Sequence, residues 1–369
     1  MRIAWVLAGG LHPSGREQMT PAIFHLLDRL ARRHDVHAFT VRHLPEATSY
    51  VLRGIRVHDL GRPRERGSVG RWSESKALLG AMGEHGPFDV VHGYQADPGV
   101  LAAWAGRRLR VPSVVTCDSG EFVALPYVEY GMQRSLRTRA LVAAACRLAT
   151  RVHVATWFME ELAHGRYGPR VVCIPIGVDV DALAGSVARE GPPWKLLNVA
   201  SINRVKDHRT LIDAVARAAG KLDVRLDIVG EDTLGGTVQD YVTKCGLADR
   251  VAFHGYRPFD ELPAFYRAAH LYVHSSRHEA AGAVFLEAAA ARLPIVSTRV
   301  GYASDLAQEG ARVVETAHPR ALARAIVETL RGPQKRVRMA ATAHAFAVQH
   351  DVDWTARQLE TLYASLLRP

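Results

Sequence analysis

The amino-acid sequence predicts an α/β protein in which two doubly wound, Rossmann-like domains face each other across a cleft. The chain has 369 residues, and a single domain usually holds about 100–200, so two domains are expected. Short apolar segments alternate with longer amphipathic ones, which is the pattern of a parallel sheet covered by helices on both faces. The alternation stops once near the middle of the chain and then begins again.

The first half opens with a strand over residues 3–7, a glycine-rich loop over 9–15 and an amphipathic helix over 16–33. Further short apolar strands are predicted at residues 36–41, 89–92, 113–117, 151–155 and 171–174. Helical patterns lie between most of these strands, which favours a parallel sheet. We assign residues 1–187 to the N-terminal domain.

The stretch over residues 185–193 is rich in Gly, Ala and Pro and predicts the interdomain linker. Strands follow at residues 196–200, 226–229, 251–254, 271–274 and 295–297, with helices at 209–219, 237–245, 261–269 and 283–292. We assign residues 188–349 to the C-terminal domain. The tail from Pro319 to Leu367 is predicted to be entirely helical, and its last helix, near 350–369, to pack back on the N-terminal domain.

The formal net charge of +10 is spread along the chain. One local basic run, Arg62 to Arg66 with Arg71, favours a solvated surface and leaves open a peripheral contact with the inner face of a membrane. No aromatic ladder accompanies the basic residues, so nucleic acid is not expected as a partner.

Several patterns point to a cytoplasmic protein. Residues 3–7 are too short for a signal-peptide core, and no apolar stretch approaches the roughly 20 residues of a membrane helix. The four cysteines are scattered, which predicts reduced thiols. Neither G-x-G-x-x-G after a strand nor G-x-x-x-x-G-K-[ST] occurs, which argues against dinucleotide-dependent oxidoreductases and P-loop enzymes.

The second half resembles the retaining glycosyltransferases of family 4, which have the GT-B fold. The resemblance is carried by five segments in the family's order: residues 197–208, 226–230, 250–256, 275–279 and 282–287, followed by 293–297 and Val300-Gly301. It implies an enzyme of polysaccharide or glycoconjugate synthesis that moves a sugar from a nucleotide diphosphate sugar to an acceptor hydroxyl with retention, without metal or another cofactor. Arg-rich, Lys-poor usage is typical of a GC-rich bacterial genome.

A cation must neutralise the leaving diphosphate as the anomeric C–O bond breaks. Lys206, at the end of a predicted strand, can supply a point charge, and it is one of only six lysines beside 41 arginines. The family usually places an arginine five residues earlier, where this chain has Ser201, which we count among the donor-binding residues. Arg204 is the candidate substitute for the missing cation.

Glu279 and Glu287 stand eight residues apart, as in the family's E-x7-E pattern. The resemblance implies that Glu279 contacts the transferred sugar and that Glu287 accepts hydrogen bonds from the ribose hydroxyls. A carboxylate suits a diol because it can accept two hydrogen bonds in a fork. The alternative is two solvated helix glutamates.

Backbone groups complete the expected donor site. Gly282 and Ala283 open a predicted helix, where free N–H groups and the helix dipole favour a phosphate. Gly301 and the residues after it could add donors, or Gly301 could serve only a turn. Gly255 and Tyr256 correspond to the family's seat for the base, which the sequence does not identify.

The first half is expected to bind the acceptor, which the sequence leaves open among a glycan, a lipid-linked sugar and a small molecule. Small residues in the loop of Gly10, His12, Ser14 and Gly15 would let the acceptor approach the donor phosphate. His12 could instead be an ordinary loop residue.

Two further residues are assigned to the acceptor side. His92 ends a predicted strand, as in the family, although a core histidine is the alternative. Glu121 begins a segment, residues 121–126, that resembles a subset of bacterial members.

Asp118 is the second departure from the family, which often has His at this position. A carboxylate there could orient a hydroxyl or stabilise positive charge at the anomeric carbon. Ser201 and Asp118 together keep two alternatives open: a GT-B-like protein that binds a nucleotide or sugar without transfer, and a nucleotide-sugar epimerase. Asp179 and Asp181 are not favoured as metal ligands, because they follow a family landmark at residues 176–178.

Overall fold

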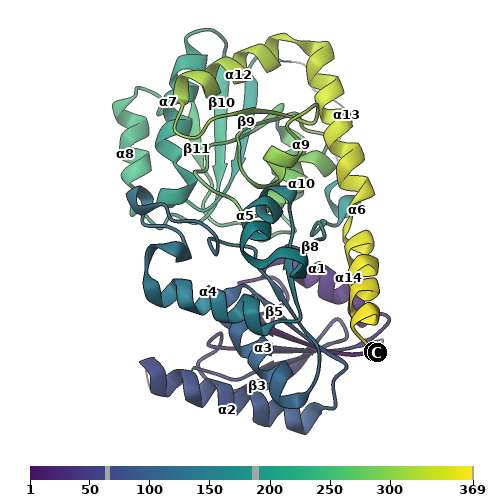
Figure 1. Cartoon of the computed structure of the whole chain (residues 1–369). Coiled ribbons are helices and arrows are strands. Elements are labelled where there is room, and N and C mark those ends of the chain that lie inside the picture. Colours follow the sequence, from purple (N-terminus) through teal and green to yellow (C-terminus); the bar gives the residue numbers. More distant parts are fainter. Residues whose placement is uncertain (63–66, 185–190, 368–369) are drawn as a thin grey trace. The chain divides into compact units, whose positions relative to one another are not determined.

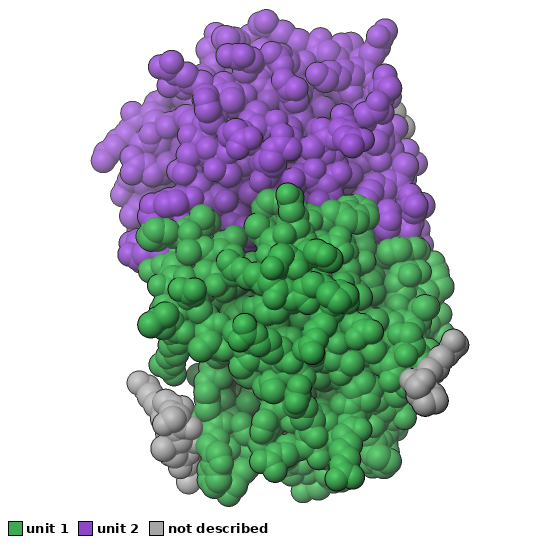
Figure 2. Space-filling view, viewed as in Figure 1, with its two compact units in different colours: residues 1–126, 130–176, 352–369 green, residues 127–129, 177–351 purple. Residues whose placement is uncertain are grey.

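A computed structural model describes residues 1–62, 67–184 and 191–367, and these form two compact units (Figures 1 and 2). Unit 1 comprises Met1–Pro126, Tyr130–Ile176 and Val352–Pro369, and unit 2 comprises Tyr127–Glu129 and Gly177–Asp351. Most of the predicted linker and of the basic run after Arg62 lies outside the described residues. Within the described residues, every helix is too short or too polar to cross a membrane.

Unit 1 contains an eight-stranded sheet in the order β3-β4-β2-β1-β5-β6-β7-β8. Its strands are β1 (Arg2–Leu7), β2 (Asp35–Thr40), β3 (Thr48–Leu52), β4 (Ile55–Asp59), β5 (Val90–Tyr94), β6 (Ser113–Thr116), β7 (Arg151–Val154) and β8 (Val171–Cys173). The helices are α1 (Pro21–Ala31), α2 (Gly67–His85), α3 (Ala96–Leu109), α4 (Leu136–Leu148) and α5 (Trp157–Tyr167), with short 3-10 turns η1 (Pro126–Val128), η2 (Met132–Arg134) and η3 (Gly168–Arg170). All strand pairs are parallel except β3 with β4.

The antiparallel hairpin of β3 and β4 was not predicted. Its two-residue loop is Arg53-Gly54, with φ of 47° and 83°. Two left-handed residues match the twist of a tight hairpin. The first helix also differs from its prediction, because it begins at Pro21 rather than Arg16 and leaves a longer loop after β1.

The last helix, α14 (Val352–Leu366), belongs to unit 1 and lies beside α1 (Figure 1). The Thr355 hydroxyl donates to the Pro175 carbonyl at 2.7 Å, and Asp353 pairs with Arg29 at 3.2 Å. Tyr363 has no exposed surface. The helix is therefore fixed to unit 1 by both buried and charged contacts.

Unit 2 contains a six-stranded, fully parallel sheet in the order β11-β10-β9-β12-β13-β14. Its strands are β9 (Trp194–Val199), β10 (Val224–Val229), β11 (Val251–Phe253), β12 (Leu271–His274), β13 (Ile295–Thr298) and β14 (Ala311–Val314), of which β14 was not predicted. Its helices are α6 (Val180–Leu183), η4 (Arg204–Lys206), α7 (His208–Ala219), α8 (Thr237–Lys244), α9 (Leu262–Ala268), α10 (Ala283–Ala290), α11 (Gly301–Asp305), α12 (Pro319–Arg331) and α13 (Pro333–Gln349).

The strand order of unit 2 reverses at β9, which lies between β10 and β12. In open parallel sheets, ligands bind beyond the carboxyl ends of the strands at such a reversal. Lys206 follows β9, and Glu279 follows β12. The topology thus brings residues that are 73 positions apart to one edge of the sheet.

Candidate functional site

The loop after β9 holds Lys206 in a short 3-10 turn. The side chain of Asn203 caps this turn, because its Oδ1 accepts from the Lys206 amide at 3.2 Å. The Ser275 hydroxyl, from the loop after β12, donates to the Lys206 carbonyl at 2.8 Å. The lysine loop is therefore fastened to the loop that carries Glu279.

Three donors converge on one carboxylate oxygen of Glu279. Lys206 Nζ lies 2.6 Å from Oε1, His274 Nε2 lies 2.9 Å from it, and the Ser276 hydroxyl donates to it at 2.5 Å. Burial would raise the pKa of Glu279, but the Lys206 charge and the hydrogen bond from His274 hold this pKa well below its usual range. Glu279 is consequently a carboxylate at neutral pH.

A buried polar chain supports this pair from behind. The Tyr272 hydroxyl lies 3.1 Å from His274 Nδ1, and Asn198 Oδ1 lies 3.1 Å from His208 Nε2. Burial lowers the pKa of His274, and it lowers the pKa of His208 to about 3. Both imidazoles are therefore neutral at pH 7 and fix the orientation of the polar loops without adding charge.

Sequence reasoning missed His274 and Ser276 as members of the site. Their signal was their position, because His274 is the last residue of β12 and Ser276 is the second residue of the polar loop at the strand's carboxyl end. Polar residues that follow a buried strand at a topological reversal are candidates for a ligand site.

Glu287 lies on α10, one helix turn inside its start. The Tyr266 hydroxyl, from α9, donates to Glu287 Oε2 at 2.6 Å. Burial raises the pKa of Glu287, and the hydrogen bond from Tyr266 only partly offsets this. Tyr266 was also missed, because nothing in its sequence context distinguishes it from an ordinary core tyrosine.

The helix α10 starts at Ala283, directly after Gly282, as the sequence predicts. Gly282 precedes the helix with φ of 74°, in the left-handed region. Because glycine has no side chain, it does not cap the first amides of the helix. Ala283 is the first helical residue and is partly exposed. Helix dipole and free amides at this end favour an anion.

The prediction that backbone amides after Gly301 are available to the donor phosphate is partly wrong. The Tyr302 amide donates to the Ala281 carbonyl at 2.9 Å, and the Ser304 amide donates to the Val300 carbonyl at 3.2 Å. Gly301 itself has φ of 45°, and a Cβ there would collide with the Ala281 carbonyl oxygen. Close backbone packing therefore explains the glycine at position 301. This agrees with the alternative that Gly301 serves only a turn.

Arg204, the candidate second cation, does not contact the Lys206–Glu279 pair through any of the hydrogen bonds or ion pairs found among the described residues. Its guanidinium pairs with Glu129 at 2.8 Å, and both side chains are more than half exposed. Exposed pairs of this kind contribute little to stability, so the Arg204 side chain can exchange partners at low cost. Ser201, after β9, is exposed.

Gly255 and Tyr256 follow β11 and are both exposed. Gly255 has φ of 66°, and its carbonyl accepts from the Gly230 amide at 2.9 Å. This bond ties the loop after β11 to the loop after β10. The aromatic ring of Tyr256 is accessible to a planar ligand, since 53% of the residue is exposed.

In unit 1, the loop after β1 is ordered by its own hydrogen bonds. His12 Nδ1 lies 2.9 Å from the Ser14 hydroxyl, and the Gly15 amide donates to the His12 carbonyl at 2.9 Å. Gly10 has φ of 87°, and a Cβ there would collide with the Thr20 hydroxyl. The predicted small residues thus permit a tight loop at the end of β1.

Asp118 follows β6 and is partly exposed. The Tyr94 hydroxyl, at the end of β5, donates to Asp118 Oδ2 at 2.6 Å. β5 and β6 are neighbours, so this contact links two adjacent carboxyl ends. The Tyr94 hydroxyl therefore fixes the orientation of the Asp118 carboxylate.

The prediction that His92 faces the acceptor is wrong. The side chain has no exposed surface, and its ring nitrogens lie 2.5 Å from the Tyr363 hydroxyl and 2.6 Å from the Thr116 hydroxyl. Burial lowers the pKa of His92, so the ring is neutral. His92 is therefore a core histidine, which was the alternative interpretation of this residue.

The prediction that Glu121 contacts the acceptor is also wrong. This carboxyl group has no exposed surface and accepts from the Ala96 amide at 3.2 Å and the Ser119 amide at 2.7 Å. It joins the start of α3 to the loop after β6. Burial raises the pKa of Glu121 to about 7, although the backbone hydrogen bonds lower it.

We therefore expect Glu121→Gln to flatten the dependence of stability on pH. The folded-state pKa lies above the unfolded value of 4.5, so the wild-type contribution is fully present below pH 4.5 and is lost as the pH rises through 7. The stability of the variant relative to wild type should rise by up to about 3 kcal/mol between pH 4.5 and pH 8. Denaturant unfolding at these two pH values measures it, and an exposed control, Glu161→Gln, should show no such slope.

One group of three histidines is the only set of possible metal ligands among the described residues. His37, His58 and His85 place one ligand atom each within 4.8 Å of one another. They belong to unit 1, whereas Lys206 and Glu279 belong to unit 2. Asp179 Oδ1 accepts from the Ala182 amide at 3.2 Å and so caps the start of α6.

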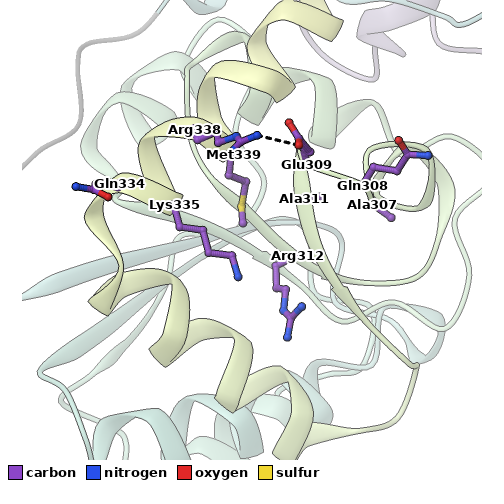
Figure 3. A pocket seen from close by; sticks show the side chains of 9 residues that line it. All are labelled: Ala307, Gln308, Glu309, Ala311, Arg312, Gln334, Lys335, Arg338 and Met339. Atoms are coloured by element: carbon purple, nitrogen blue, oxygen red, sulfur yellow. Dashed lines mark hydrogen bonds and ion pairs between the residues drawn. The ribbon is translucent and has the colours of Figure 1, made fainter.

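A surface hollow of about 490 Å³ in unit 2 is separate from the predicted donor residues (Figure 3). It is lined by residues before and within β14 and by the start of α13. Arg338 reaches Glu309 across it at 3.0 Å, and Arg312 and Lys335 also line it. None of the predicted site residues takes part in its wall.

Two family profiles together match most of the chain. The profile described as "Glycosyl transferase 4-like domain" matches residues 19–177, and "Glycosyl transferases group 1" matches residues 180–346. The D-inositol 3-phosphate glycosyltransferase of Corynebacterium urealyticum is 30% identical over 317 residues, which cover 79% of this chain and 74% of that protein. The phosphatidyl-myo-inositol mannosyltransferase of Mycobacterium leprae is 28% identical over 312 residues, covering 81% and 80%.

Solved structures share the fold over almost the whole chain. Sucrose-phosphate synthase from Thermosynechococcus elongatus has a TM-score of 0.81 at 19% identity and covers 99% of both chains. HepE from Anabaena, solved in complex with UDP and glucose, has a TM-score of 0.77 at 21% identity and covers 99% of this chain and 100% of that one.

These likenesses and the two sheets define the fold as GT-B, the two-domain architecture of one large class of glycosyltransferases. Within this class, the chain belongs to the family 4 glycosyltransferases.

Proposed function

We propose that this glycosyltransferase moves a sugar from a nucleotide diphosphate donor to an acceptor hydroxyl with retention at the anomeric carbon. The observation that supports it most is the buried pair of Lys206 and Glu279 at the strand reversal of unit 2. In this proposal the α10 amides after Gly282 and the Lys206 ammonium meet the diphosphate.

Lys206 can serve the donor without leaving Glu279. An ammonium group has three N–H donors, and one of them suffices for the 2.6 Å contact with Glu279 Oε1. The other two are available to phosphate oxygens. Lys206 then supplies the positive charge that the departing diphosphate requires, and no metal ion is needed for this step.

Glu279 has a second role in the proposal. Its three side-chain donors, Lys206, His274 and Ser276, all reach Oε1, which leaves Oε2 for a hydroxyl of the donor sugar. Retention follows if the acceptor hydroxyl attacks from the face of the leaving group and passes its proton to the departing phosphate oxygen. Such a path requires no protein base, and the neutral, buried His274 is already held by Glu279 and Ser276.

A panel of nucleotide sugars tests the proposal. UDP- and GDP-sugars are ranked first by thermal shift, because a ligand that binds the folded state raises the melting temperature. The best donors are then incubated with glycans, lipid-linked sugars and inositol phosphates, and nucleotide release and the anomeric configuration of the product are measured. Binding without turnover on any acceptor would favour a binding protein, conversion of one free donor into another would favour an epimerase, and an inverted product would refute retention.

Glu287→Ala should weaken the binding of the free nucleotide diphosphate by about 1–3 kcal/mol, because a buried ribose diol would lose its acceptor. Titration calorimetry measures this affinity. Tyr266→Phe is the matched control: it removes the 2.6 Å hydrogen bond to Glu287 but keeps the carboxylate, so its loss should be smaller. An unchanged affinity in Glu287→Ala would argue against the ribose role.

A further inference from the structure

Three histidines from separate elements of unit 1 converge at one place. His37 lies in β2, His58 lies in β4, and His85 is the last residue of α2. His37 and His58 are buried, and His85 is partly exposed. His37 Nδ1 faces His58 Nε2 at 3.0 Å, and the ring of His85 stacks on that of His58 with centroids 3.9 Å apart.

The outward-facing nitrogens of the two buried histidines also have polar partners. His37 Nε2 lies 3.3 Å from Asp35 Oδ1, and His58 Nδ1 lies 3.1 Å from the Ser49 hydroxyl. A partner on the outer nitrogen of a histidine fixes its tautomer and directs the other lone pair inward. This carboxylate–histidine or hydroxyl–histidine arrangement is the usual support of a metal-ligating imidazole.

We propose that His37, His58 and His85 bind a divalent transition-metal ion of the zinc type that fastens the end of α2 to β2 and β4. Tetrahedral zinc with Zn–N bonds near 2.0–2.1 Å places its ligand nitrogens about 3.3 Å apart. The facing nitrogens of His37 and His58, 3.0 Å apart, need to separate by only a few tenths of an ångström.

His85 completes the site by a side-chain rotation. Parallel stacked rings cannot both direct in-plane lone pairs at one ion, so its ring must turn toward the pair. His85 is at the end of its helix and partly exposed, which allows this turn and gives the ion an entry route. Water would take the fourth position.

Proton balance requires no release to solvent. Without metal, the Ser49 hydroxyl can donate to His58 Nδ1 and His58 Nε2–H can donate to His37 Nδ1, while His37 Nε2 lies near Asp35 Oδ1 without a hydrogen bond. With metal, the proton of His58 moves from Nε2 to Nδ1 and Ser49 becomes the acceptor. The imidazoles of His37 and His58 stay neutral, and their two inward lone pairs become ligands.

The surroundings select the kind of ion. The rings of Phe39 and Phe88 lie 5.0 Å from the ring of His58 and 5.2 Å from the ring of His37, respectively. The candidate ligand set consists of imidazole nitrogens, which suit zinc, copper or nickel rather than magnesium or calcium. The ion would be structural, since these histidines belong to the unit that does not contain Lys206 and Glu279.

Tag-free, chelator-treated full-length protein titrated with ZnCl2 tests the proposal. We expect one zinc per chain by plasma mass spectrometry, a rise in melting temperature with zinc, and a loss of affinity of at least ten-fold in His85→Ala. Circular dichroism without metal checks that this variant folds. His164→Ala removes an exposed histidine of α5 and should leave both the stoichiometry and the affinity unchanged.

A second variant and a second metal separate a built site from surface binding. Ser49→Ala should lower zinc affinity roughly ten-fold, as losses of outer partners usually do, while the metal-free melting temperature changes little. Cobalt(II) should give the absorption bands of a tetrahedral nitrogen site in wild type but not in His85→Ala. Equal zinc affinity in wild type and His85→Ala, or no zinc retained beyond that of a chelator-treated control protein, would overturn the proposal.

Discussion

Lys206→Ala is expected to lower the turnover of sugar transfer by about 10²–10³-fold while the affinity for the nucleotide diphosphate falls much less. Removal of one group that stabilises developing charge in a transition state typically has an effect of this size. Lys206 Nζ is fixed 2.6 Å from Glu279 and is mostly buried. An ammonium held in place before the reaction interacts most strongly when the diphosphate gains its full charge.

The measurement compares kcat, KM and the nucleotide dissociation constant in wild type and variant, with the donor found in the panel. Lys195→Ala is a matched control, because Lys195 is exposed on β9 of the same sheet. Lys206→Arg keeps the positive charge and should retain part of the activity. Equal losses in binding and turnover would instead assign Lys206 to ground-state binding.

The elements predicted best from sequence were the buried parallel strands, because short continuous apolar runs bounded by turn residues are typical of strands covered on both faces. The hairpin of β3 and β4 was missed because both strands are short and β3 is largely exposed, and only the Arg53-Gly54 loop marks it. β14 was missed for a similar reason, since it is a four-residue edge strand in which only Ala311 is buried.

The candidate site was predictable where a motif has fixed spacing and unpredictable where its parts meet only in three dimensions. Lys206, Glu279 and Glu287 came from the family pattern. Lys206 and Glu279 are 73 residues apart and meet because β9 and β12 are neighbours. His92 was assigned wrongly because its partner Tyr363 is 271 residues away, and no local pattern signals which residue of the N-terminal domain the last helix contacts.

Glu279→Gln should lower sugar transfer by about two orders of magnitude or more and leave binding of the sugar-free nucleotide nearly unchanged. The amide keeps the volume of the side chain but removes the negative charge of the carboxylate. This carboxylate orients Lys206 and accepts hydrogen bonds from His274 and Ser276. Loss of one charge of a buried ion pair is costly because the other charge, here that of Lys206, is left without compensation. Steady-state kinetics with calorimetry on the same preparations separates the two effects, and retained transfer would exclude a catalytic role for this carboxylate.

The dependence of the free energy of unfolding on pH tests the environments of Glu279 and Glu287 without knowledge of the acceptor. Glu279 has a folded-state pKa below the unfolded value of 4.5, so its stabilising contribution is present above pH 4.5 and is lost as the pH falls through the folded-state pKa. Glu287 has a raised pKa, so its contribution is present below pH 4.5 and is lost as the pH rises through the folded-state pKa. Acidification from pH 7 to pH 4 should therefore lower wild-type stability relative to Glu279→Gln and raise it relative to Glu287→Gln. Burial raises the pKa of both carboxyl groups; Lys206 and His274 more than offset this effect at Glu279, whereas the Tyr266 hydroxyl offsets it only partly at Glu287, and the slopes are therefore opposite.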